Sequence, residues 1–513
     1  MSHDRIGAKS FFPDKGVYLY VLLMVMFSGA LAVRLYNVES PPLDFHEVRQ
    51  YHSFLIARSF YYSSQDSAPE AEKKTALAAR PPLLEPFIIE YAASVLYRIF
   101  GGESMVIPRL MSIIFWLASA VFLYLLARDL ISPDAAVIAL SFFLFLPYGV
   151  WASRSFQPDP LMVMFLLAAL YSVFKYYRQP SPKNLGAASV LSAIAAFVKP
   201  VSLFPLFGAF IASRISTGDL RKIVSGRDMV IFAAVSVTPI ILYSVYAYFF
   251  AGFLKDQVEG RFVPGLYMQN SYWLGWLRLV SIIIGKWPLI LSLAGILLVR
   301  SGAERAFLLG LWIGYVVFGL VFTMHISTHD YYHLMLIPIV ALSLGGAAAV
   351  LLERLAPCQG ILRLGAWILF TSAIILSLRT SAPLLNDSGF EARIELDKEI
   401  GELVSHSDNT IILDGYYGNR LKYHGKLAGK NWPTRNDFES WRMRGKPHDR
   451  GKELLAQLIT ERSPEYFIIS DLSQLEGQDE LKEALDTGYA VVAETQDYII
   501  YDLKSKSSSP GAE

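Results

Sequence analysis

The chain has 513 residues, of which 53% are hydrophobic and 18% charged, and its mean hydropathy is +0.38. Soluble globular domains are typically about 45–50% apolar and about 25% charged, so these values exclude an ordinary soluble protein. The 46 Lys and Arg residues nearly balance the 45 Asp and Glu residues, for a net charge of +1. No charge excess therefore points to a nucleic-acid partner.

The charges are unevenly divided along the chain. Residues 1–380 carry 30 basic and 21 acidic side chains, a net charge of +9, whereas residues 381–513 carry 16 basic and 24 acidic ones, a net charge of −8. This step is typical of a membrane body joined to a soluble domain. We therefore predict a transmembrane domain at 1–380 and an extracytoplasmic α/β domain at 381–513. The single cysteine, Cys358, excludes a disulfide within the chain.

Apolar runs predict a mainly α, polytopic membrane protein with about eleven transmembrane helices. Each run is long enough, or nearly long enough, to cross the roughly 30 Å of bilayer hydrocarbon. The first lacks a convincing cleavage site and is followed by others, so we interpret it as a transmembrane helix rather than a signal peptide. The runs fall at residues 17–36, 106–127, 134–151, 160–177, 184–199, 201–214, 229–250, 286–300, 305–323, 334–352 and 362–380.

Positive charge in the short loops predicts the orientation. If the N-terminus is cytoplasmic, the short inner loops hold 15 Lys and Arg residues and the short outer loops hold four. The positive-inside rule then places the tail outside.

The first outer loop, residues 37–105, carries segments too short or too polar to span a membrane. Asp44-Phe45-His46-Glu47 reads as a capping box before residues 48–62, whose apolar side chains have helical spacing. We predict interfacial helices there, at 83–100 and at 272–284.

The tail alternates predicted helices and strands, which favours a small α/β domain. We interpret Gly415-Tyr416-Tyr417-Gly418 as a turn, because its spacing does not match a dinucleotide-binding fingerprint. The predicted helices are 390–404 and 452–461, and the predicted strands are 410–413, 465–470, 490–493 and 498–503.

Ionisable residues collect at the predicted outer interface, where they are candidates for function. Cations there can pair with the phosphate of a lipid carrier, and a carboxylate can accept the proton of an attacking hydroxyl. The candidates are Asp44, Arg80, Glu85, Arg154, Asp159, Lys199 and Lys286. Each of these residues except Arg80 also has a purely structural explanation. Asp44, Glu85 and Asp159 could each begin a helix, and Arg154 could form an ion pair with Asp159. Lys199 and Lys286 could contact lipid headgroups.

Three histidines are spaced by four residues: His325, His329 and His333. On one helix this spacing could bind a metal ion, but Ser327-Thr328 and Asp330 favour a loop of interfacial polar residues equally well. We predict no metal site from these residues. No cofactor is required, and a divalent metal is left open.

The order of several motifs resembles the protein mannosyltransferase superfamily of family C glycosyltransferases, including the bacterial lipid A aminoarabinose transferases. The resemblance covers residues 17 to about 380. The motifs are Asp44 in a long first outer loop, Arg80-Pro81-Pro82-Leu83-Leu84-Glu85-Pro86, Asp159-Pro160, Lys199 between paired runs, and Asp330-Tyr331-Tyr332 before a run that contains Pro338.

The resemblance implies that Asp44 is the catalytic carboxylate and that Lys199 contacts the donor phosphate. Glu85, Arg154, Asp159 and Tyr331 would shape the site. Two features depart from the family pattern: no lysine follows Glu85, which leaves Arg80 or Lys286 as a second phosphate contact, and the segment at 269–270 lacks a histidine similar to a metal contact in the aminoarabinose enzymes.

The sequence therefore predicts a glycosyltransferase of the bacterial inner membrane, with its site and tail facing the periplasm or exterior. It would move a sugar from a polyprenyl-phosphate donor to a hydroxyl of an envelope glycan, lipid or protein, with inversion and with Asp44 as general base. Its partners would be the donor, membrane lipids and the acceptor. The alternative is a transporter or flippase for a lipid-linked saccharide, although no internal repeat is visible.

Overall fold

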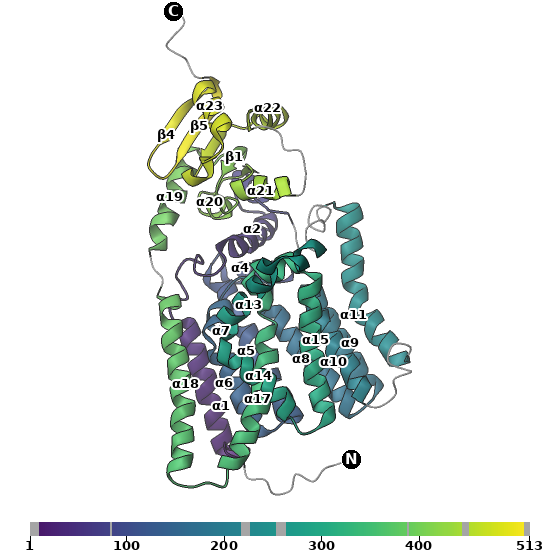
Figure 1. The fold of residues 1–513 in the computed structure, drawn as a ribbon. Helices are drawn as coiled ribbons and strands as arrows, with labels where there is room; N and C mark the ends of the chain where they lie inside the picture. The colour runs from purple at the N-terminus through teal and green to yellow at the C-terminus, as the bar shows by residue number, and fades with distance from the viewer. Residues whose placement is uncertain are drawn as a thin grey trace, which may run out of the picture. The chain divides into compact units, whose positions relative to one another are not determined.

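A computed structural model describes residues 10–82, 85–216, 226–252, 263–386, 389–443 and 451–506 (Figure 1). The chain divides into two compact units. The first, called here the helical unit, comprises Met1–Val38, Leu83–Ile89 and Pro108–Asn386. The second, the mixed unit, comprises Glu39–Pro82, Glu90–Ile107 and Asp387–Glu513. The helical unit thus ends close to the expected boundary at 380, and most of the first predicted outer loop groups with the tail.

Each of the eleven predicted apolar runs falls on a helix or on a pair of consecutive helices. Run 134–151 is divided between two helices, and run 229–250 continues from a helix into a short π-helical turn. The bounds are α1 Gly16–Leu35, α5 Val106–Leu130, α6 Pro133–Phe145, α7 Pro147–Ala152, α8 Asp159–Arg178, α9 Pro182–Val198, η1 Pro200–Ser202, α10 Leu203–Ser216, α11 Arg227–Val245, η3 Tyr246–Phe250, η4 Pro264–Met268, α13 Asn270–Ile284, α14 Lys286–Leu298, α15 Gly302–Val321, α16 Thr323–Thr328, η5 Asp330–His333, α17 Leu336–Leu355 and α18 Ile361–Leu385.

The helix lengths support a multi-pass membrane protein. In the described part of the chain, seven helices are long and apolar enough to cross a membrane, or eight if α13 and α14, which meet at 93°, form one broken span. Three further apolar helices, Pro133–Phe145, Pro182–Val198 and Pro200–Ser216, have 10–17 residues. A helix of that length covers at most about 26 Å, so helix length alone does not establish the predicted count of eleven spans.

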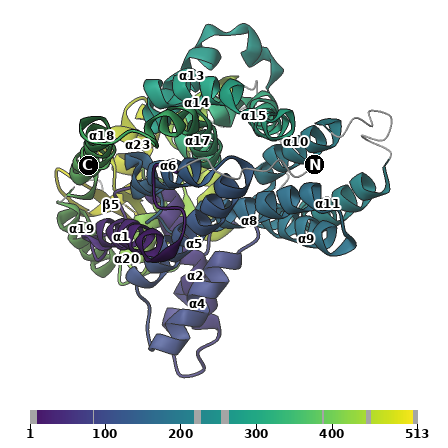
Figure 2. The ribbon, with the colours of Figure 1, turned by 90° about the horizontal axis from the view of Figure 1, so that it is seen from below.

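Glycines bring two helices of this unit into backbone contact. A methyl group on Gly208 of α10 would collide with the carbonyl of Gly310 on α15, and one on Gly314 would collide with the carbonyl of Phe204. Small residues allow such close approach between helices. Helices α8, α9, α10 and α11 lie side by side in the same region (Figure 2).

The mixed unit contains a five-stranded sheet with the order β2-β1-β3-β5-β4. Strand β1 pairs in parallel with β2 and β3, whereas β5 is antiparallel to both β3 and β4. The four predicted strands and both predicted tail helices are present, and β2 is a strand that the sequence did not predict. The bounds are α19 Phe390–Leu403, β1 Thr410–Leu413, α20 Asn419–His424, β2 Gly429–Asn431, α21 Arg435–Met443, α22 Gly451–Arg462, β3 Tyr466–Ile469, η6 Leu472–Leu475, α23 Asp479–Gly488, β4 Tyr489–Glu494 and β5 Ile499–Lys506.

Both faces of this sheet are covered, which explains the uninterrupted apolar sequence of β1. Ile411 and Leu413 pack with residues of α22 and α23 on one face. Ile412 packs with residues of α19 and α20 on the other. The turn predicted at 415–418 follows β1, and the Asp414 carboxylate accepts hydrogen bonds from the backbone amides of Tyr416 and Gly418.

The first predicted outer loop also contributes helices to the mixed unit: α2 Glu47–Ser63, α3 Glu70–Ala78 and α4 Ile88–Phe100. Helices α2 and α4 lie side by side (Figure 2), joined by a 2.8 Å hydrogen bond from Ser53 to Glu90 and by ring contacts. Helix α3 was not predicted, because its Glu- and Lys-rich sequence has little apolar periodicity.

Candidate active site

A buried ion pair connects two helix ends of the helical unit. Lys199 directly follows α9, and Asp159 is the first residue of α8. The Nζ atom of Lys199 lies 2.8 and 3.0 Å from the two carboxylate oxygens of Asp159. The side chains are 3% and 1% exposed. Because a buried charge is costly unless it is paired, each residue holds the other in place.

This geometry corrects the structural alternatives considered for the two residues. The N-cap position of α8 is Pro158, without a side-chain capping bond, so Asp159 is not the helix cap. Lys199 is buried rather than extended toward lipid headgroups, because its ammonium group turns to Asp159. Lys199 also supplies a cation beside Asp159, a role that the sequence had suggested for Arg154.

Two aromatic rings flank the same ammonium group. Tyr331 and Tyr332 of η5 have their ring centroids 5.0 and 4.6 Å from the Nζ atom of Lys199. These distances are within the roughly 6 Å range of a cation–π interaction. Tyr331 is only 7% exposed, so the predicted site residues Lys199, Asp159 and Tyr331 form one buried cluster.

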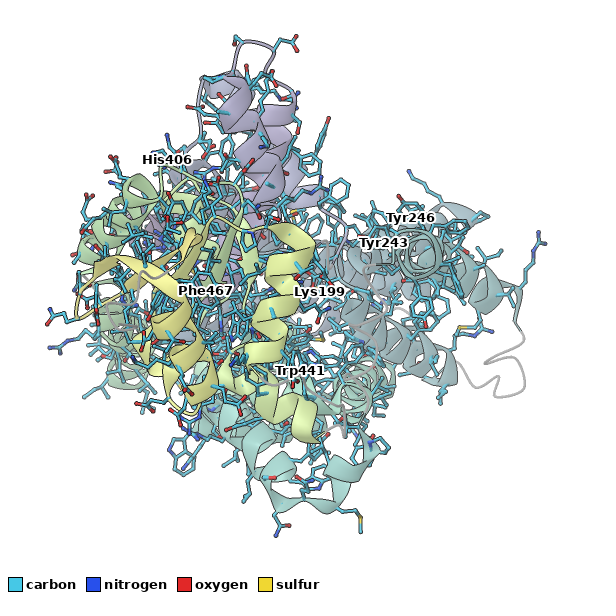
Figure 3. The ribbon with its side chains drawn as sticks, turned by 90° about the horizontal axis from the view of Figure 1, so that it is seen from above. Lys199, Tyr243, Tyr246, His406, Trp441 and Phe467 are labelled. Carbon is cyan, nitrogen blue, oxygen red and sulfur yellow. The ribbon has the colours of Figure 1, made fainter. Side chains whose placement is uncertain are left out.

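A small cavity lies beside this cluster. Its volume is about 70 Å³, well below the roughly 300–1,000 Å³ typical of pockets for whole ligands. It can therefore hold a small group rather than a sugar ring. Lys199 and Tyr243, both labelled in Figure 3, line it together with Glu85, Ser244, Phe322 and Tyr332.

Buried arginines hold the chain at the end of α1. Arg154 donates to the backbone oxygen of Asn37 at 2.7 Å, and Arg109 donates to that of Val38 at 3.1 Å. Both are at most 1% exposed, as is Arg34, which lies near Arg154. Arg34 and Arg109 were not among the predicted site residues, although an arginine inside an apolar run is a usable signal of function. Arg154 thus fixes the backbone at Asn37.

Asp44 lies in the mixed unit, in the turn before α2, and is half-buried. The capping box expected at this point is wrong. Helix α2 begins at Glu47, and His46 occupies the N-cap position in the left-handed conformation, with φ 47° and ψ 62° and no side-chain capping bond. Asp44 is therefore not the N-cap residue of α2.

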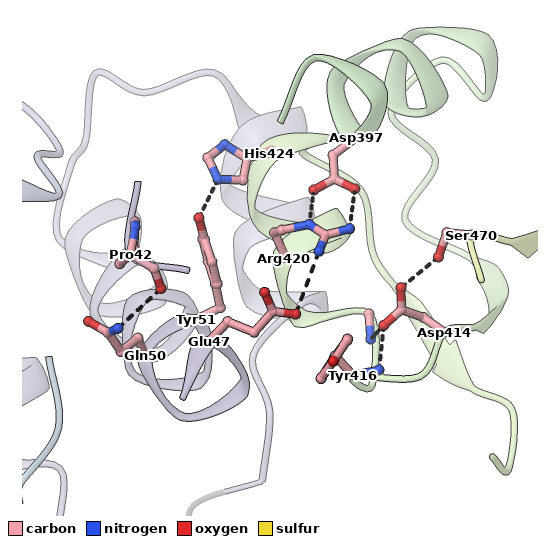
Figure 4. Close-up of polar contacts among 11 residues, drawn as sticks. Pro42, Glu47, Gln50, Tyr51, Asp397, Asp414, Tyr416, Arg420, His424 and Ser470 are labelled. Atoms are coloured by element: carbon pink, nitrogen blue, oxygen red, sulfur yellow. Dashed lines mark hydrogen bonds and ion pairs between the residues drawn. The ribbon is translucent and has the colours of Figure 1, made fainter. Parts of the chain in front are cut away.

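The mixed unit ties α2 to the tail through a polar network (Figure 4). Arg420 of α20 lies 2.7 Å from the carboxylate of Asp397 on α19 and 3.5 Å from that of Glu47 on α2. Tyr51 of α2 hydrogen bonds to His424 at 2.8 Å. Burial raises the pKa of Asp397 to about 6, and burial together with nearby cations lowers the pKa of His424 to about 3. No local sequence pattern predicts these contacts.

The remaining predicted phosphate contacts, Arg80 and Lys286, come from other elements of the chain. Arg80 belongs to the mixed unit, where its guanidinium group lies 4.9 Å from the ring centroid of Phe60. Lys286 is the exposed first residue of α14. The structure therefore brings Glu85, Asp159, Lys199 and Tyr331 together within the helical unit, while the roles of Arg80 and Lys286 remain proposals.

The three spaced histidines do not share a helix. A backbone break separates His325 on α16 from His333 on η5. Both ring nitrogens of His333 have protein partners, the Tyr315 hydroxyl at 2.6 Å and the backbone oxygen of Ile326 at 3.0 Å. His333 is thus a core residue, and no metal-binding cluster of His, Cys, Asp and Glu occurs within the described ranges.

Residues 84–249 match the family model described as dolichyl-phosphate-mannose-protein mannosyltransferase. No curated protein matches the chain. The structure of ArnT from Cupriavidus metallidurans, bound to undecaprenyl phosphate, is similar with a TM-score of 0.59 and 14% identity, over 94% of this chain and 98% of ArnT.

Two other solved structures share the fold. The oligosaccharyltransferase AglB from Archaeoglobus fulgidus, in complex with an inhibitory peptide and a dolichol-phosphate, has a TM-score of 0.55 and 13% identity, over 95% of this chain and 74% of AglB. The arabinofuranosyltransferase AftD from Mycobacteria has a TM-score of 0.52 and 14% identity, over 96% of this chain but 40% of AftD.

These likenesses establish the fold as that of the family C glycosyltransferases, a class of multi-pass membrane enzymes. The family-model match covers residues 84–249, about a third of the chain, and together with the shared fold it supports glycosyltransferase activity. The fold that the family resemblance of the sequence implies is thereby confirmed.

Proposed function

We propose that this membrane glycosyltransferase moves one sugar from a polyprenyl-phosphate carrier to a hydroxyl of an envelope glycan, lipid or protein. The observation that carries the proposal is the buried Lys199–Asp159 pair, whose Lys199 lies against two tyrosine rings and lines a cavity of a size suited to a small group. ArnT was solved with undecaprenyl phosphate and AglB with a dolichol-phosphate, which supports a donor of this class.

The phosphate would bind at the Lys199 end of this cavity. A phosphate oxygen accepts charge-assisted hydrogen bonds from an ammonium group, and Lys199 is held in one orientation by Asp159. Because the carboxylate of Asp159 offsets the charge of Lys199, the phosphate needs a further cation. Arg80 and Lys286 are the proposed sources, and Glu85, Arg154, Asp159 and Tyr331 would shape the site.

Asp44 would act as the general base. In one step, the acceptor hydroxyl oxygen forms a bond to the anomeric carbon, and the bond from that carbon to the phosphate oxygen breaks. The polyprenyl phosphate leaves with the bonding electrons, and the hydroxyl proton passes to the Asp44 carboxylate. A single displacement of this kind inverts the anomeric configuration. No cofactor takes part in these steps.

The reaction would take place at the outer face of the bacterial inner membrane, with residues 37–105 and the tail toward the periplasm or exterior. The charge counts in the short loops support this orientation. The rival proposal, a flippase for lipid-linked saccharides, involves no bond cleavage, so a chemical assay separates the two.

The test uses the purified full-length chain, synthetic polyprenyl-phosphate sugars and extracted envelope material. The wild type should release polyprenyl phosphate as sugar enters the acceptor fraction. Asp44→Asn should retain donor affinity but lower turnover by at least about a hundredfold, the lower end of general-base assistance. Asp66→Asn, which alters an exposed carboxylate of the same predicted loop, is the matched control. Near-normal turnover of Asp44→Asn would refute the base assignment, and absence of any release by the wild type with every donor and acceptor fraction would favour the flippase.

A further inference from the structure

A second cavity lies in the mixed unit, among α2, α3, α20 and the connection after α19. Its volume is about 320 Å³, within the roughly 300–1,000 Å³ range of pockets that hold small molecules. The side chains that line it are mostly polar or charged, and basic groups outnumber acidic ones. They include Arg58, Tyr62, Glu72, His406, Lys422 and Lys426.

The cations of this cavity differ in their protein partners. Arg58 is neutralised by Glu103, whose oxygens accept three hydrogen bonds of 2.9–3.0 Å from it. Lys422 is only 7% exposed, and its hydrogen-bond partner is the neutral side chain of Asn431, at 2.5 Å. Within the described ranges, neither Lys422 nor Lys426 forms an ion pair with a carboxylate.

A buried ammonium group without a counter-ion is costly, because burial removes its hydration. The pKa of Lys422 reflects this cost, since burial lowers it to about 8. The nearby Asp414 carboxylate raises the pKa of Lys422 and the nearby Lys430 ammonium lowers it, but burial has the largest effect. An anion bound in the cavity would add to the partial counter-charge that Asp414 provides.

The backbone holds two more basic side chains at the cavity in an uncommon conformation. His406 and Lys426 have φ angles of 54° and 48°, in the left-handed region that non-glycine residues seldom adopt. His406, labelled in Figure 3, donates from Nδ1 to the backbone oxygen of Gly425 at 2.8 Å. This bond fixes the imidazole ring and leaves Nε2 as the second site for a proton.

We propose that this cavity, called here the α3–α20 cavity, binds a phosphorylated or carboxylated sugar. Lys422, Lys426 and His406 would pair with the anionic group, and the hydroxyls of Tyr62 and Ser405 would contact the neutral part of the sugar. This site is distinct from the Lys199 cluster and does not depend on the proposed transfer reaction.

The alternative is that Lys422 and Lys426 only stabilise the fold and bind no ligand. Lys422 lies in the last turn of the six-residue helix α20, and Lys426 follows it closely. Cations near a helix C-terminus add only about 0.3–1 kcal/mol of stability through the helix dipole. In that role the lysines would affect unfolding but not the binding of an anion.

The experiment is calorimetric titration of the full-length protein in detergent with glucose 6-phosphate, glucuronate, inorganic phosphate and neutral glucose. The two anionic sugars should bind, glucose should not, and inorganic phosphate should bind more weakly than glucose 6-phosphate. Lys422→Gln with Lys426→Gln should weaken binding of the anionic sugars at least tenfold. Lys426→Gln alone should weaken binding of the anionic sugars several-fold. Because Lys426 is exposed, this single variant should fold normally and so tests the site even if the double variant misfolds.

Lys452→Gln, which alters an exposed lysine of α22 outside the cavity, is the matched control and should bind as the wild type does. Asp44→Asn should also bind normally, so failure of the transferase proposal and failure of this one are distinguishable. Equal affinity of wild type and the Lys422/Lys426 variants would overturn the site. Binding of inorganic phosphate as tight as that of glucose 6-phosphate would overturn the sugar component.

Discussion

Removal of one member of the Lys199–Asp159 pair should destabilise the helical unit strongly. At a separation of 2.8 Å, two unit charges attract by about 6 kcal/mol at the effective dielectric constant of about 20 that describes protein sites. Desolvation offsets part of this attraction. Loss of one partner from a buried pair typically costs about 3–5 kcal/mol, because the other charge is left buried and unpaired.

The prediction is tested by a double-mutant cycle with Lys199→Met, Asp159→Asn and the combined variant. Each single change should lower the free energy of unfolding by about 3–5 kcal/mol. The combined variant should lose markedly less than the sum of the two, since it leaves neither charge unpaired. Unfolding is measured in mixed detergent micelles, with Lys286→Met as the control for loss of an exposed lysine.

Donor binding separates structure from function in the same variants. If Lys199 contacts the donor phosphate, the combined variant should regain stability but not donor affinity, because charge-assisted hydrogen bonds contribute about 1.5–3 kcal/mol. A combined variant with wild-type donor affinity would refute the phosphate contact. A coupling energy near zero would refute the burial argument itself.

Three further predictions concern other parts of the chain. Gly310→Val should destabilise or misfold the helical unit, whereas Gly302→Val should have little effect in the same unfolding assay, because Gly302 has open space around it. Equal stability of the two variants would contradict the close packing of α10 and α15. Two buried groups of the mixed unit respond to acid in opposite directions. Between about pH 6.5 and 3 the unfolded state binds a proton at His424 that the folded state binds only near pH 3, which lowers stability, whereas the folded state binds a proton at Asp397 from about pH 6, which offsets part of that loss. His424→Gln should therefore make the mixed unit more stable to acid relative to its stability at neutral pH, by up to about 5 kcal/mol at 1.36 kcal/mol per pKa unit, and an unchanged pH profile of unfolding would count against a buried neutral imidazole. A membrane-impermeant thiol reagent applied to spheroplasts should miss Cys358 but label Glu391→Cys, and labelling of Cys358 would reverse the proposed orientation.

The sequence determined the positions of the helices in the membrane-spanning part. Long apolar runs can satisfy their backbone only as helices in a bilayer, which is why all eleven runs coincide with helices. Apolar periodicity likewise placed α2, α19, α22 and the strands β1, β3, β4 and β5. Helix lengths were less predictable, since run 134–151 is divided between α6 and α7.

Tertiary structure decided which charged residues meet. Lys199 and Asp159 are 40 residues apart and are joined only by the packing of α8 against α9. Arg420 reaches Glu47 across more than 370 positions, and only the fold of the mixed unit makes that contact. A backbone detail decided the cap of α2, because the left-handed conformation of His46 delays the helix start to Glu47. Hydropathy and local spacing indicate which side of each segment is buried. The pairing of buried charges depends on which segments pack together in three dimensions, and no local sequence pattern contains that information.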